Sequence, residues 1–393
     1  MSGGPINRAD TTAAGFAALK RGDLHGARAF FDRATREGGD DAAAWFGLSR
    51  VHRSLGAPAE ENIALDRALS LDPKHLPALL AKGDLLAKVG DARAADAYYG
   101  AGLKLAASIP SLSAEWREEL RRVEALRQGF AREYEAHLMQ ALAGLGLGGP
   151  GTERFVHAVE LLLGKKQIYL QQPKYFFYPE LPHVQFFDRR SFPWVDTLEG
   201  EFEAIRAEAQ ALIEADVGFE PYVQRDPNRP AFDPRGLMDN PNWGAFYLVK
   251  DGAPVAQNAA LCPRTFAALG QVPLCRLENR TPAVLFSLLR PGTRIPPHHG
   301  FTNARVIAHL PLIVPRDCAL RVGNETRAWR EGEVMIFDDS IEHEAWNRSG
   351  APRIVLIFDV WRPELSAQER HLIAEMLAAI DRFGGGQASR WSD

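Results

Sequence analysis

The sequence predicts a multidomain α + β protein in which an array of α-helical repeats precedes a jelly-roll β-domain with flanking helices. Three observations lead to this prediction. A motif recurs every 34 residues in the N-terminal third, a glycine-rich segment begins at Gly144, and short runs of strand length follow from Pro241 onward. A chain of 393 residues is long for one domain and suits two, each with its own core.

The composition is that of an ordinary globular protein, with 46% hydrophobic and 24% charged residues. A net charge of −4 gives no indication of nucleic-acid binding. Cys262, Cys275 and Cys318 fit no zinc or disulfide pattern, so we expect free thiols and a cytoplasmic protein. The chain opens without a basic start or an apolar run, and no apolar stretch approaches membrane-spanning length, so neither a signal peptide nor a membrane span is expected.

Two kinds of residue recur at the 34-residue period. They are Gly22, Gly56 and Gly90, and the large residues Phe31, Leu65 and Tyr99. The glycine suits a turn between two helices, and the large side chain suits the space between them. This pattern resembles the tetratricopeptide repeat, with departures at Glu61 and Gly102, where the other copies have alanine. We expect about three repeats over residues 8–108, because a single hairpin cannot bury its own apolar face.

The repeats lead into a longer helix, a linker and the second domain. Residues 113–142 have apolar side chains at helical spacing, which places the first domain at residues 8–143. Residues 144–168 are expected to be a linker with a short helix around 155–163. The second domain then covers residues 169–393, with an amphipathic helix at 196–214.

Short runs of strand length follow one another in the second domain, which favours a sandwich or jelly roll. The expected strands are 245–249, 284–289, 305–312, 319–322, 334–337 and 353–361. Gly323 and Asn324 indicate a hairpin turn. A last helix is expected at 366–383, with Ser366 and Glu369 as its capping box. Its buried stripe is expected to be Leu372, Ile373, Met376, Leu377 and Ile380.

Histidines in two segments between the expected strands suggest chemistry. PGTRIPPHHG begins at Pro291, FDDSIEHEAW begins at Phe337, and Arg353 follows ten positions after His343. Imidazole is a good ligand for Fe(II), and the fork of an arginine suits a planar carboxylate. This pattern is typical of a non-haem iron site with an oxo-acid co-substrate.

The motifs FSLLRPGTRIPPHHG, TNARVIAHLPL, FDDSIEHEAWN and DVWRPEL resemble the aspartyl/asparaginyl β-hydroxylase family. WGAFYL at Trp243 and CPRT at Cys262 extend the resemblance, which covers roughly residues 170–393. A tetratricopeptide region also precedes this domain in the family. The resemblance implies a double-stranded β-helix (cupin-like) domain and a dioxygenase that uses Fe(II), 2-oxoglutarate and O2.

The resemblance also implies roles for particular residues. His298 and His343 match the iron ligands, and Gly300 stands where the carboxylate of the commoner iron motif would be. The neighbouring His299 makes the first ligand a question that the sequence leaves open. Arg353, helped by Ser287, matches the group that binds the distal carboxylate of 2-oxoglutarate. His309 matches a residue beside the iron-side carboxylate.

Three further residues have open roles. Arg305 shares a strand face with His309 and could contact the substrate, the oxo-acid, or a carboxylate of its own domain. Asp338 and Asp339 could supply a third ligand, although capping the turn and orienting His343 is the simpler interpretation. Animal members of the family carry an arginine where Ile307 stands, and a substrate-binding polar residue where Ala245 stands, which puts the substrate in doubt.

The predicted reaction is oxidative decarboxylation of 2-oxoglutarate to succinate and CO2, coupled to hydroxylation of an aspartyl or asparaginyl side chain. The repeats offer a surface for such a peptide or protein substrate. One alternative is a hydroxylase or halogenase of a free amino acid, a lipid or another small molecule. A second is a non-catalytic scaffold with a degraded barrel, against which the retained His298, His343, Arg353 and Ser287 count.

Overall fold

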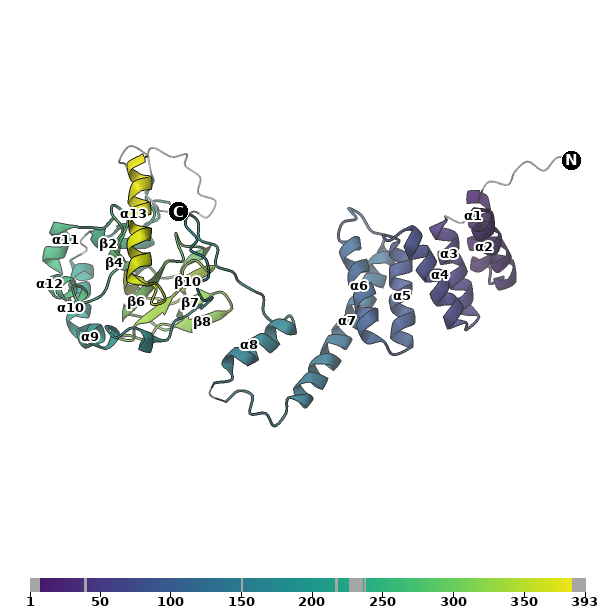
Figure 1. Cartoon of the computed structure of the whole chain (residues 1–393), viewed down its shortest axis with the longest axis horizontal. Coiled ribbons are helices and arrows are strands. Elements are labelled where there is room, and N and C mark those ends of the chain that lie inside the picture. Colours follow the sequence, from purple (N-terminus) through teal and green to yellow (C-terminus); the bar gives the residue numbers. More distant parts are fainter. Residues whose placement is uncertain are drawn as a thin grey trace. The chain divides into compact units, whose positions relative to one another are not determined.

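The structure is a computed structural model that describes residues 8–38, 41–149, 151–215, 218–225, 236 and 238–383. The chain divides into two compact units, Met1–Leu163 and Gly164–Asp393 (Figure 1). Within the described ranges, no helix combines the length and apolar character needed to cross a membrane.

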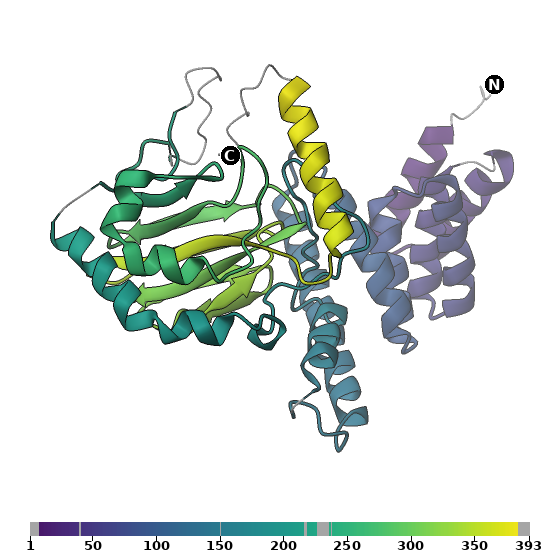
Figure 2. The same ribbon diagram turned by 60° about the vertical axis from the view of Figure 1, so that its left-hand side comes forward.

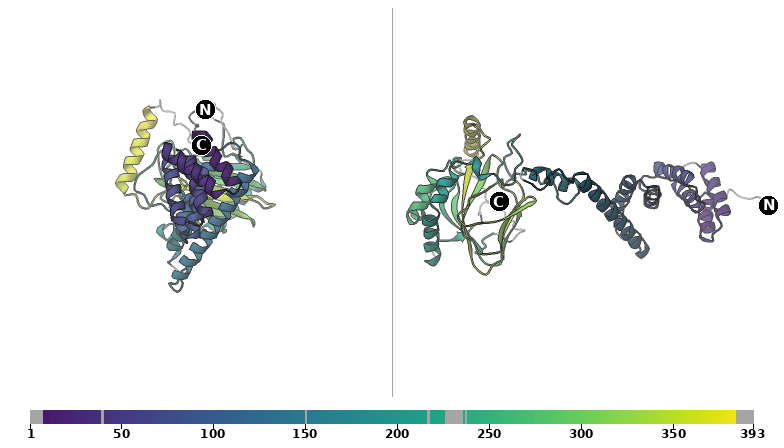
Figure 3. Two further views of the ribbon diagram at one scale, coloured as in Figure 1. Left: turned by 90° about the vertical axis from the view of Figure 1, so that its right-hand side faces the viewer. Right: turned by 90° about the horizontal axis from the view of Figure 1, so that it is seen from below.

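The N-terminal unit begins with three helical hairpins, which Figures 1 and 3 show from several sides. The helices are α1 (Arg8–Lys20), α2 (Leu24–Gly38), α3 (Ala42–Ser54), α4 (Pro58–Leu71), α5 (Leu76–Lys88) and α6 (Ala92–Ala106). The helices α1, α3 and α5 begin 34 residues apart, and so do α2, α4 and α6. The predicted period and the predicted number of repeats are therefore confirmed.

The repeated residues occupy the positions expected of them. Gly22, Gly56 and Gly90 have φ values of 78°, 70° and 89°, a left-handed conformation that glycine adopts without steric cost. Phe31, Leu65 and Tyr99 are fully buried. A Cβ on Gly47 would overlap the ring of Phe31 and one on Gly83 the ring of Tyr99, so these glycines let neighbouring helices approach closely, between two hairpins at Gly47 and within one at Gly83.

Tyr99→Ala is expected to destabilise the N-terminal unit by about 3–5 kcal/mol, because it leaves a large cavity and removes the bond from the Tyr99 hydroxyl to Asp84 (2.7 Å). Urea unfolding followed by circular dichroism would measure the change. Tyr98→Ala is the matched control, since Tyr98 is only half-buried and should cost much less. Equal costs for the two variants would contradict the packing described here.

The rest of the N-terminal unit is α7 (Ala114–Ala141) and α8 (Glu153–Leu162). Ser113 caps α7 by accepting a hydrogen bond from the backbone N–H of Trp116 (3.2 Å). The glycine-rich segment between the two helices has left-handed φ values at Gly144, Gly146 and Gly148, which explains why glycine is needed there.

The C-terminal unit contains two antiparallel sheets (Figure 2). The larger runs in the order β1 (Glu220–Pro221), β2 (Trp243–Lys250), β4 (Val284–Leu289), β11 (Arg353–Trp361), β6 (Arg305–Ile313) and β9 (Met335–Phe337), with β3 (Ala253–Pro254) paired to β2. The smaller runs β5 (Thr293–His298), β10 (His343–Asn347), β7 (Cys318–Val322) and β8 (Glu325–Ala328). The two antiparallel sheets agree with the predicted β-domain, and the double-stranded β-helix class stays a prediction.

Helices cover one face of the large sheet. They include α9 (Val195–Gly200), α10 (Phe202–Glu214), α11 (Ala256–Leu261) and α12 (Pro263–Leu269), which follow the short helix η1 (Arg189–Ser191). The main core lies between these helices and the sheet, around buried residues such as Ile205, Phe286 and Leu356. A second core, which includes Phe337, Leu289 and Leu320, draws residues from both sheets.

Two helix predictions need correction. The single helix expected at 196–214 is two helices that meet at Glu201, immediately after Gly200, a poor helix former. The last helix, α13 (Ala367–Phe383), has the predicted capping box, with Ser366 and Glu369 exchanging backbone-to-side-chain bonds. Its buried stripe is narrower than expected. Ile373 and Leu377 are buried, whereas Leu372, Met376 and Ile380 are exposed.

The strands β5, β8 and β10 were not predicted. β5 contains Pro296 and Pro297, and β8 and β10 carry charged residues, so none has the apolar run that identified the others. The expected hairpin at Gly323 and Asn324 is confirmed, because it joins β7 to β8 with Gly323 at a φ of 55°.

Candidate active site

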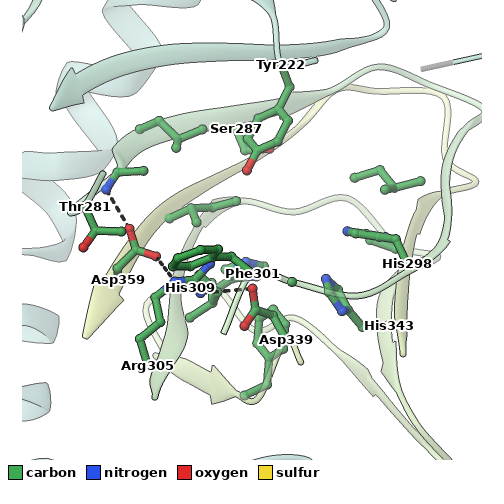
Figure 4. Close-up of a pocket in the computed structure, with 18 of the residues that line it drawn as sticks. Tyr222, Thr281, Ser287, His298, Phe301, Arg305, His309, Asp339, His343 and Asp359 are labelled. Atoms are coloured by element: carbon green, nitrogen blue, oxygen red, sulfur yellow. Dashed lines mark hydrogen bonds and ion pairs between the residues drawn. The ribbon is translucent and has the colours of Figure 1, made fainter. Parts of the chain in front are cut away.

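A cavity of about 410 Å³ is lined by strands of both sheets of the C-terminal unit (Figure 4). One wall comes from β2, β4, β6 and β11 of the large sheet, and the opposite wall comes from β5 and β10 of the small one. All six residues to which the sequence assigned a role in binding iron or 2-oxoglutarate line this cavity. They are Ser287, His298, Arg305, His309, His343 and Arg353.

His298 and His343 are direct partners across β5 and β10. Their ring centroids are 4.0 Å apart, and Figure 4 shows the two rings side by side. The register between the strands shifts after this pair, because three residue steps on β5 (Ile295 to His298) face two on β10 (His343 to Ala345). Pro296 and Pro297 lie in that shift, where their missing N–H groups cost no ladder bond. The bulge thus fits the sequence and sets the direction of His298.

Both imidazoles are oriented as metal ligands would be. Nδ1 of His298 lies 2.8 Å from the carbonyl oxygen of Pro296, and Nδ1 of His343 lies 3.0 Å from that of Ile341. A carbonyl only accepts, so each Nδ1 carries the hydrogen and each Nε2 carries the lone pair. Burial and the neighbouring His298 hold the pKa of His343 well below its usual value, which keeps this ring in the neutral form that binds metals.

The structure favours His298 over His299 as the partner of His343, because His298 ends β5 directly opposite His343. In the part of the chain that is described, no group of three or more His, Cys, Asp or Glu side chains could hold a metal ion. The facing rings of His298 and His343 offer two imidazole donors. Such a set suits Fe(II) and leaves coordination positions for other ligands.

Asp339 occupies the space next to Gly300. The backbone N–H of Gly300 donates to the carbonyl oxygen of Asp339 (2.6 Å), and a Cβ added to Gly300 would overlap the Asp339 carboxylate. Burial raises the pKa of Asp339 to about 6, although the nearby Arg305 opposes this rise. The absence of a side chain at residue 300 is thus a packing requirement of this site.

Gly300→Ala is expected to cost about 1–3 kcal/mol of stability, since its Cβ must displace the buried Asp339 carboxylate. The affinity for Fe(II) should fall as well. Thermal unfolding would measure the loss of stability, and titration with Fe(II) under anaerobic conditions would measure the loss of affinity. Gly350→Ala is the control, because no atom lies within 4 Å of its added Cβ. An unchanged melting temperature in Gly300→Ala would contradict the close approach of Asp339.

Arg353 and Ser287 lie at a fully buried end of the cavity, on β11 and β4. Within the described structure, the buried Arg353 Nε and Ser287 Oγ have no hydrogen-bond partner. The guanidinium carbon lies 4.9 Å from the centroid of Trp329, and burial lowers the pKa of Arg353 to about 10. A buried cation beside a buried hydroxyl, each with bonding capacity left over, fits a carboxylate that binds to both.

His309 lies between this end and the histidine pair. The indole N–H of Trp329 donates to its Nδ1 (3.2 Å), so Nε2 carries the hydrogen and is a donor. Burial and the charge of Arg353 lower the pKa of His309 to about 3, and the ring is therefore neutral at physiological pH. This tautomer suits a carboxylate acceptor near the metal position.

Arg305 is held by two carboxylates of its own domain. Its Nη1 donates to Asp339 (3.0 Å), and its Nε lies 3.0 Å from Asp359 in an ion pair without hydrogen-bond alignment (Figure 4). Burial alone would lower the pKa of Arg305, but the two carboxylates raise it above its usual value. Of the roles that the sequence left open, the ion pair inside the domain is the one observed, so its assignment to the oxo-acid is not supported by these contacts.

Asp338 has a separate function in the same turn. It accepts hydrogen bonds from the backbone N–H of Ser340 (3.0 Å), from Arg362 (2.7 Å) and from Gln171 (2.7 Å). The Arg362–Asp338 pair is fully buried. These contacts fix the turn before His343, as expected for a residue that caps the turn.

Sequence reasoning missed the supporting residues Trp329, Asp359 and Arg362. Trp329 and Arg362 act through partners 20 or more positions away, and Asp359 pairs with Arg305 across two adjacent strands. The one available signal was the alternation of β11, which places Asp359 on the same face as Arg353.

Comparison with known proteins extends these findings. Residues 199–363 match the family model described as aspartyl/asparaginyl beta-hydroxylase. Human aspartate beta-hydroxylase domain-containing protein 2 is 36% identical over 208 residues, which is 52% of this chain and 54% of the relative. The ornithine lipid ester-linked acyl 2-hydroxylase of Rhizobium tropici is 34% identical over 194 residues, 47% of this chain and 63% of the relative.

The human aspartyl/asparaginyl beta-hydroxylase is 35% identical over 180 residues, 45% of this chain and 22% of the relative. The chain spans about half the length of the first curated relatives it matches. The helical unit is similar to the type III secretion translocator chaperone SycD of Yersinia enterocolitica, at 17% identity and a TM-score of 0.31 over 34% of this chain and 97% of that one. The assignment of the repeats depends on the 34-residue spacing of the helices described above.

Proposed function

Because the C-terminal unit belongs to the aspartyl/asparaginyl β-hydroxylase family, we propose that it is an Fe(II)- and 2-oxoglutarate-dependent dioxygenase that hydroxylates an organic substrate. His298 and His343 would hold the iron, and Arg353 with Ser287 would hold the distal carboxylate of 2-oxoglutarate.

One observation supports this proposal most directly. Two buried polar atoms, Arg353 Nε and Ser287 Oγ, face the same cavity as the two imidazoles, and neither has a partner in the described structure. A protein rarely buries such groups without a bonding partner. A dicarboxylate that reaches from Arg353 toward the histidine pair would satisfy both atoms.

Iron, when bound with 2-oxoglutarate and O2, supplies the oxidation of a C–H bond. The chain's own residues bind and orient. Arg353 places the far carboxylate, and the Nε2–H of His309 is positioned to donate to the carboxylate at the other end. Ser287, His309 and Arg353 are buried, and a buried environment strengthens polar contacts such as these.

Two substrate classes follow from the sequence and from the names of the relatives. The first is an aspartyl or asparaginyl side chain of a peptide or protein, as the human relative's name states for that protein. The second is a lipid, free amino acid or other small molecule, supported by the acyl 2-hydroxylase relative. In the first case, the helical repeats would supply the docking surface for the protein partner.

The test is Fe(II)-dependent formation of succinate from 2-oxoglutarate, measured on the purified full chain. We expect succinate even without substrate, at a slow rate, and none when iron is removed by a chelator. A chain that binds neither Fe(II) nor 2-oxoglutarate would instead be the non-catalytic scaffold considered from the sequence.

Deleting residues 1–110 separates the role of the repeats from that of the cavity. If the repeats dock a protein substrate, the deletion should reduce hydroxylation of a protein and leave hydroxylation of a small molecule unchanged. Mass spectrometry would detect the added oxygen as a +16 shift. Equal loss on both kinds of substrate would show that the deletion damages the C-terminal unit itself.

A further inference from the structure

Residues 171–178, which we call the strap, lie against the two segments that flank the histidine pair, the turn before β10 and the loop after β5. Gln171 forms an isolated antiparallel bridge with Ile341, and the backbone N–H of Lys174 donates to the carbonyl oxygen of Gly300 (2.9 Å). The first contact lies two residues before one candidate iron ligand, and the second lies two residues after the other. The strap therefore connects the turn to the loop.

This connection matters because the ladder between β5 and β10 ends at the histidine pair. His298 is the last residue of β5, His343 is the first of β10, and the two are the outermost partners of the ladder. Beyond them, the backbone N–H of Gly300 donates to the carbonyl oxygen of Asp339 (2.6 Å). Further bonds between the turn and the loop would help to keep the two rings at a fixed separation.

The bridge to the strap also involves the group that orients His343. The carbonyl oxygen of Ile341 lies 3.0 Å from Nδ1 of His343 and holds that ring. Gln171 pairs with Ile341 in the bridge described above. A displacement of the strap would therefore move Ile341 and turn the imidazole of His343.

The side chain of Gln171 binds the turn and the loop at the same time. Its Nε2 donates to Asp338 Oδ2 (2.7 Å) and to the carbonyl oxygen of Pro182 (3.1 Å), and its Oε1 accepts from Nδ2 of Asn303 (3.0 Å). Asp338 lies five positions before one candidate ligand, and Asn303 lies five positions after the other. A single carboxamide thus spans the two segments.

The partners fix the orientation of both amides. A carboxylate only accepts, so the NH2 group of Gln171 is the one that faces Asp338. The Oδ1 of Asn303 accepts from the backbone N–H of Tyr178 (2.7 Å), so the NH2 group of Asn303 faces the Gln171 oxygen. Asp338 and Asn303 are fully buried. Glutamine suits this position because glutamate lacks the donor and leucine lacks both donor and acceptor.

We propose that Gln171 is a positioning residue, which keeps the turn before β10 and the loop after β5 at the separation that the two imidazoles need to bind one metal ion. It acts through Asp338, Ile341 and Asn303 and is not itself a catalytic residue. The inference rests on the function proposed above, because it assigns the metal to the histidine pair.

Two substitutions of similar size test the role of the carboxamide. Gln171→Leu removes all three hydrogen bonds, and Gln171→Glu removes both donors and places a carboxylate against that of Asp338. Loss of a direct partner of a metal ligand costs about 10–100-fold in affinity, and Gln171 acts one contact further away. We therefore expect Gln171→Leu to weaken Fe(II) binding about three- to ten-fold, and Gln171→Glu at least as much, in anaerobic titrations of the full chain.

Gln172 provides the matched control, because it is the adjacent glutamine and its side chain is exposed. The same two substitutions there keep the bond from the Gln172 backbone N–H to the carbonyl oxygen of Ser340 (2.7 Å), so Fe(II) affinity should not change. Equal losses at positions 171 and 172 would overturn the assignment of the role to the Gln171 side chain. Wild-type affinity in both Gln171 variants would overturn it as well.

Amide hydrogen exchange of the metal-free full chain tests the connection without any activity. In both Gln171 variants, peptides that cover residues 299–303 and 338–342 should exchange faster, while peptides from α10 should be unchanged, because local opening affects only the segments released. Faster exchange in just one of the two segments would contradict a connection between them. Faster exchange throughout the C-terminal unit would point to a general loss of stability and also overturn the proposal.

Succinate kinetics at saturating Fe(II) separate failure of this inference from failure of the proposed function. The KM for 2-oxoglutarate should stay at the wild-type value in both Gln171 variants, since Arg353 and Ser287 belong to β11 and β4. A raised KM would count against a role confined to the histidine pair. If the wild-type chain bound neither Fe(II) nor 2-oxoglutarate, the proposed function would fail, whereas the exchange experiment would still decide whether Gln171 connects the turn to the loop.

Discussion

His343→Ala is expected to abolish iron-dependent succinate formation and to lower the affinity for Fe(II) by more than about 100-fold. Loss of a residue that only supports a metal ligand already costs about 10–100-fold, and His343 would be a ligand itself. Its ring is buried, lies 4.0 Å from that of His298, and presents Nε2 because Nδ1 is held by the carbonyl of Ile341. The measurements are anaerobic Fe(II) titration and a succinate assay.

His299→Ala is the matched control for this prediction. His299 is also an imidazole at the cavity, but it follows the end of β5 and is not the strand partner of His343. We expect its removal to change iron affinity only a few-fold, whereas His298→Ala should behave as His343→Ala does. If His299→Ala lost the metal and His298→Ala kept it, the assignment of the first ligand would be wrong. Circular dichroism of each variant would exclude unfolding as the cause.

The parts of the fold that were predicted well have a local signal in the sequence. β4 and β11 were predicted with the observed bounds, because most of their residues are apolar. The helical repeats were predicted from a period that recurs in the chain, and their turn glycines have the expected φ values. Both faces of β4 and β11 are buried, and this burial requires apolar residues along most of each strand.

The strands that carry the two histidines had no such signal. β5 contains two prolines, and three of the five residues of β10 are a histidine, a glutamate and an asparagine. Family resemblance identified His298 and His343, but only the strand register brings the two rings together. The pairs Arg305–Asp359 and Arg362–Asp338 likewise depend on contacts between distant segments, which no local pattern encodes.

Buried carboxylates explain why Arg305 and Arg353, which both line the cavity, have different roles. Two carboxylates surround Arg305, so its charge is neutralised and its role is to hold β6 against the turn of Asp339. Arg353 is equally buried but has no carboxylate partner in the described structure, which leaves its charge for a ligand. A buried guanidinium without a counter-ion is costly unless an anion binds to it.

Arg353→Lys is therefore expected to raise the KM for 2-oxoglutarate by about 10- to 100-fold, because an ammonium group cannot replace the two parallel hydrogen bonds of a guanidinium. Ser287 can supply only one bond to the same carboxylate. The lysine would also lose contact with the Trp329 ring, which lies 4.9 Å from the guanidinium carbon. Isothermal titration with 2-oxoglutarate and succinate kinetics would measure the change. Arg348→Lys, at an exposed position after β10, is the control and should leave the KM unchanged.

The pH dependence of this variant tests the environment of Arg353 directly. Burial lowers the pKa of Arg353 to about 10, so the wild-type side chain stays charged up to pH 8. A lysine begins from an ordinary pKa of about 10.4, and the same burial would lower it further. Its positive charge is present below the lowered pKa and is lost as the pH rises through it. The KM of Arg353→Lys for 2-oxoglutarate should therefore rise between pH 7 and 8, where that of the wild type is flat. A variant whose KM is high but independent of pH would show that position 353 is open to solvent, contrary to the buried site described here.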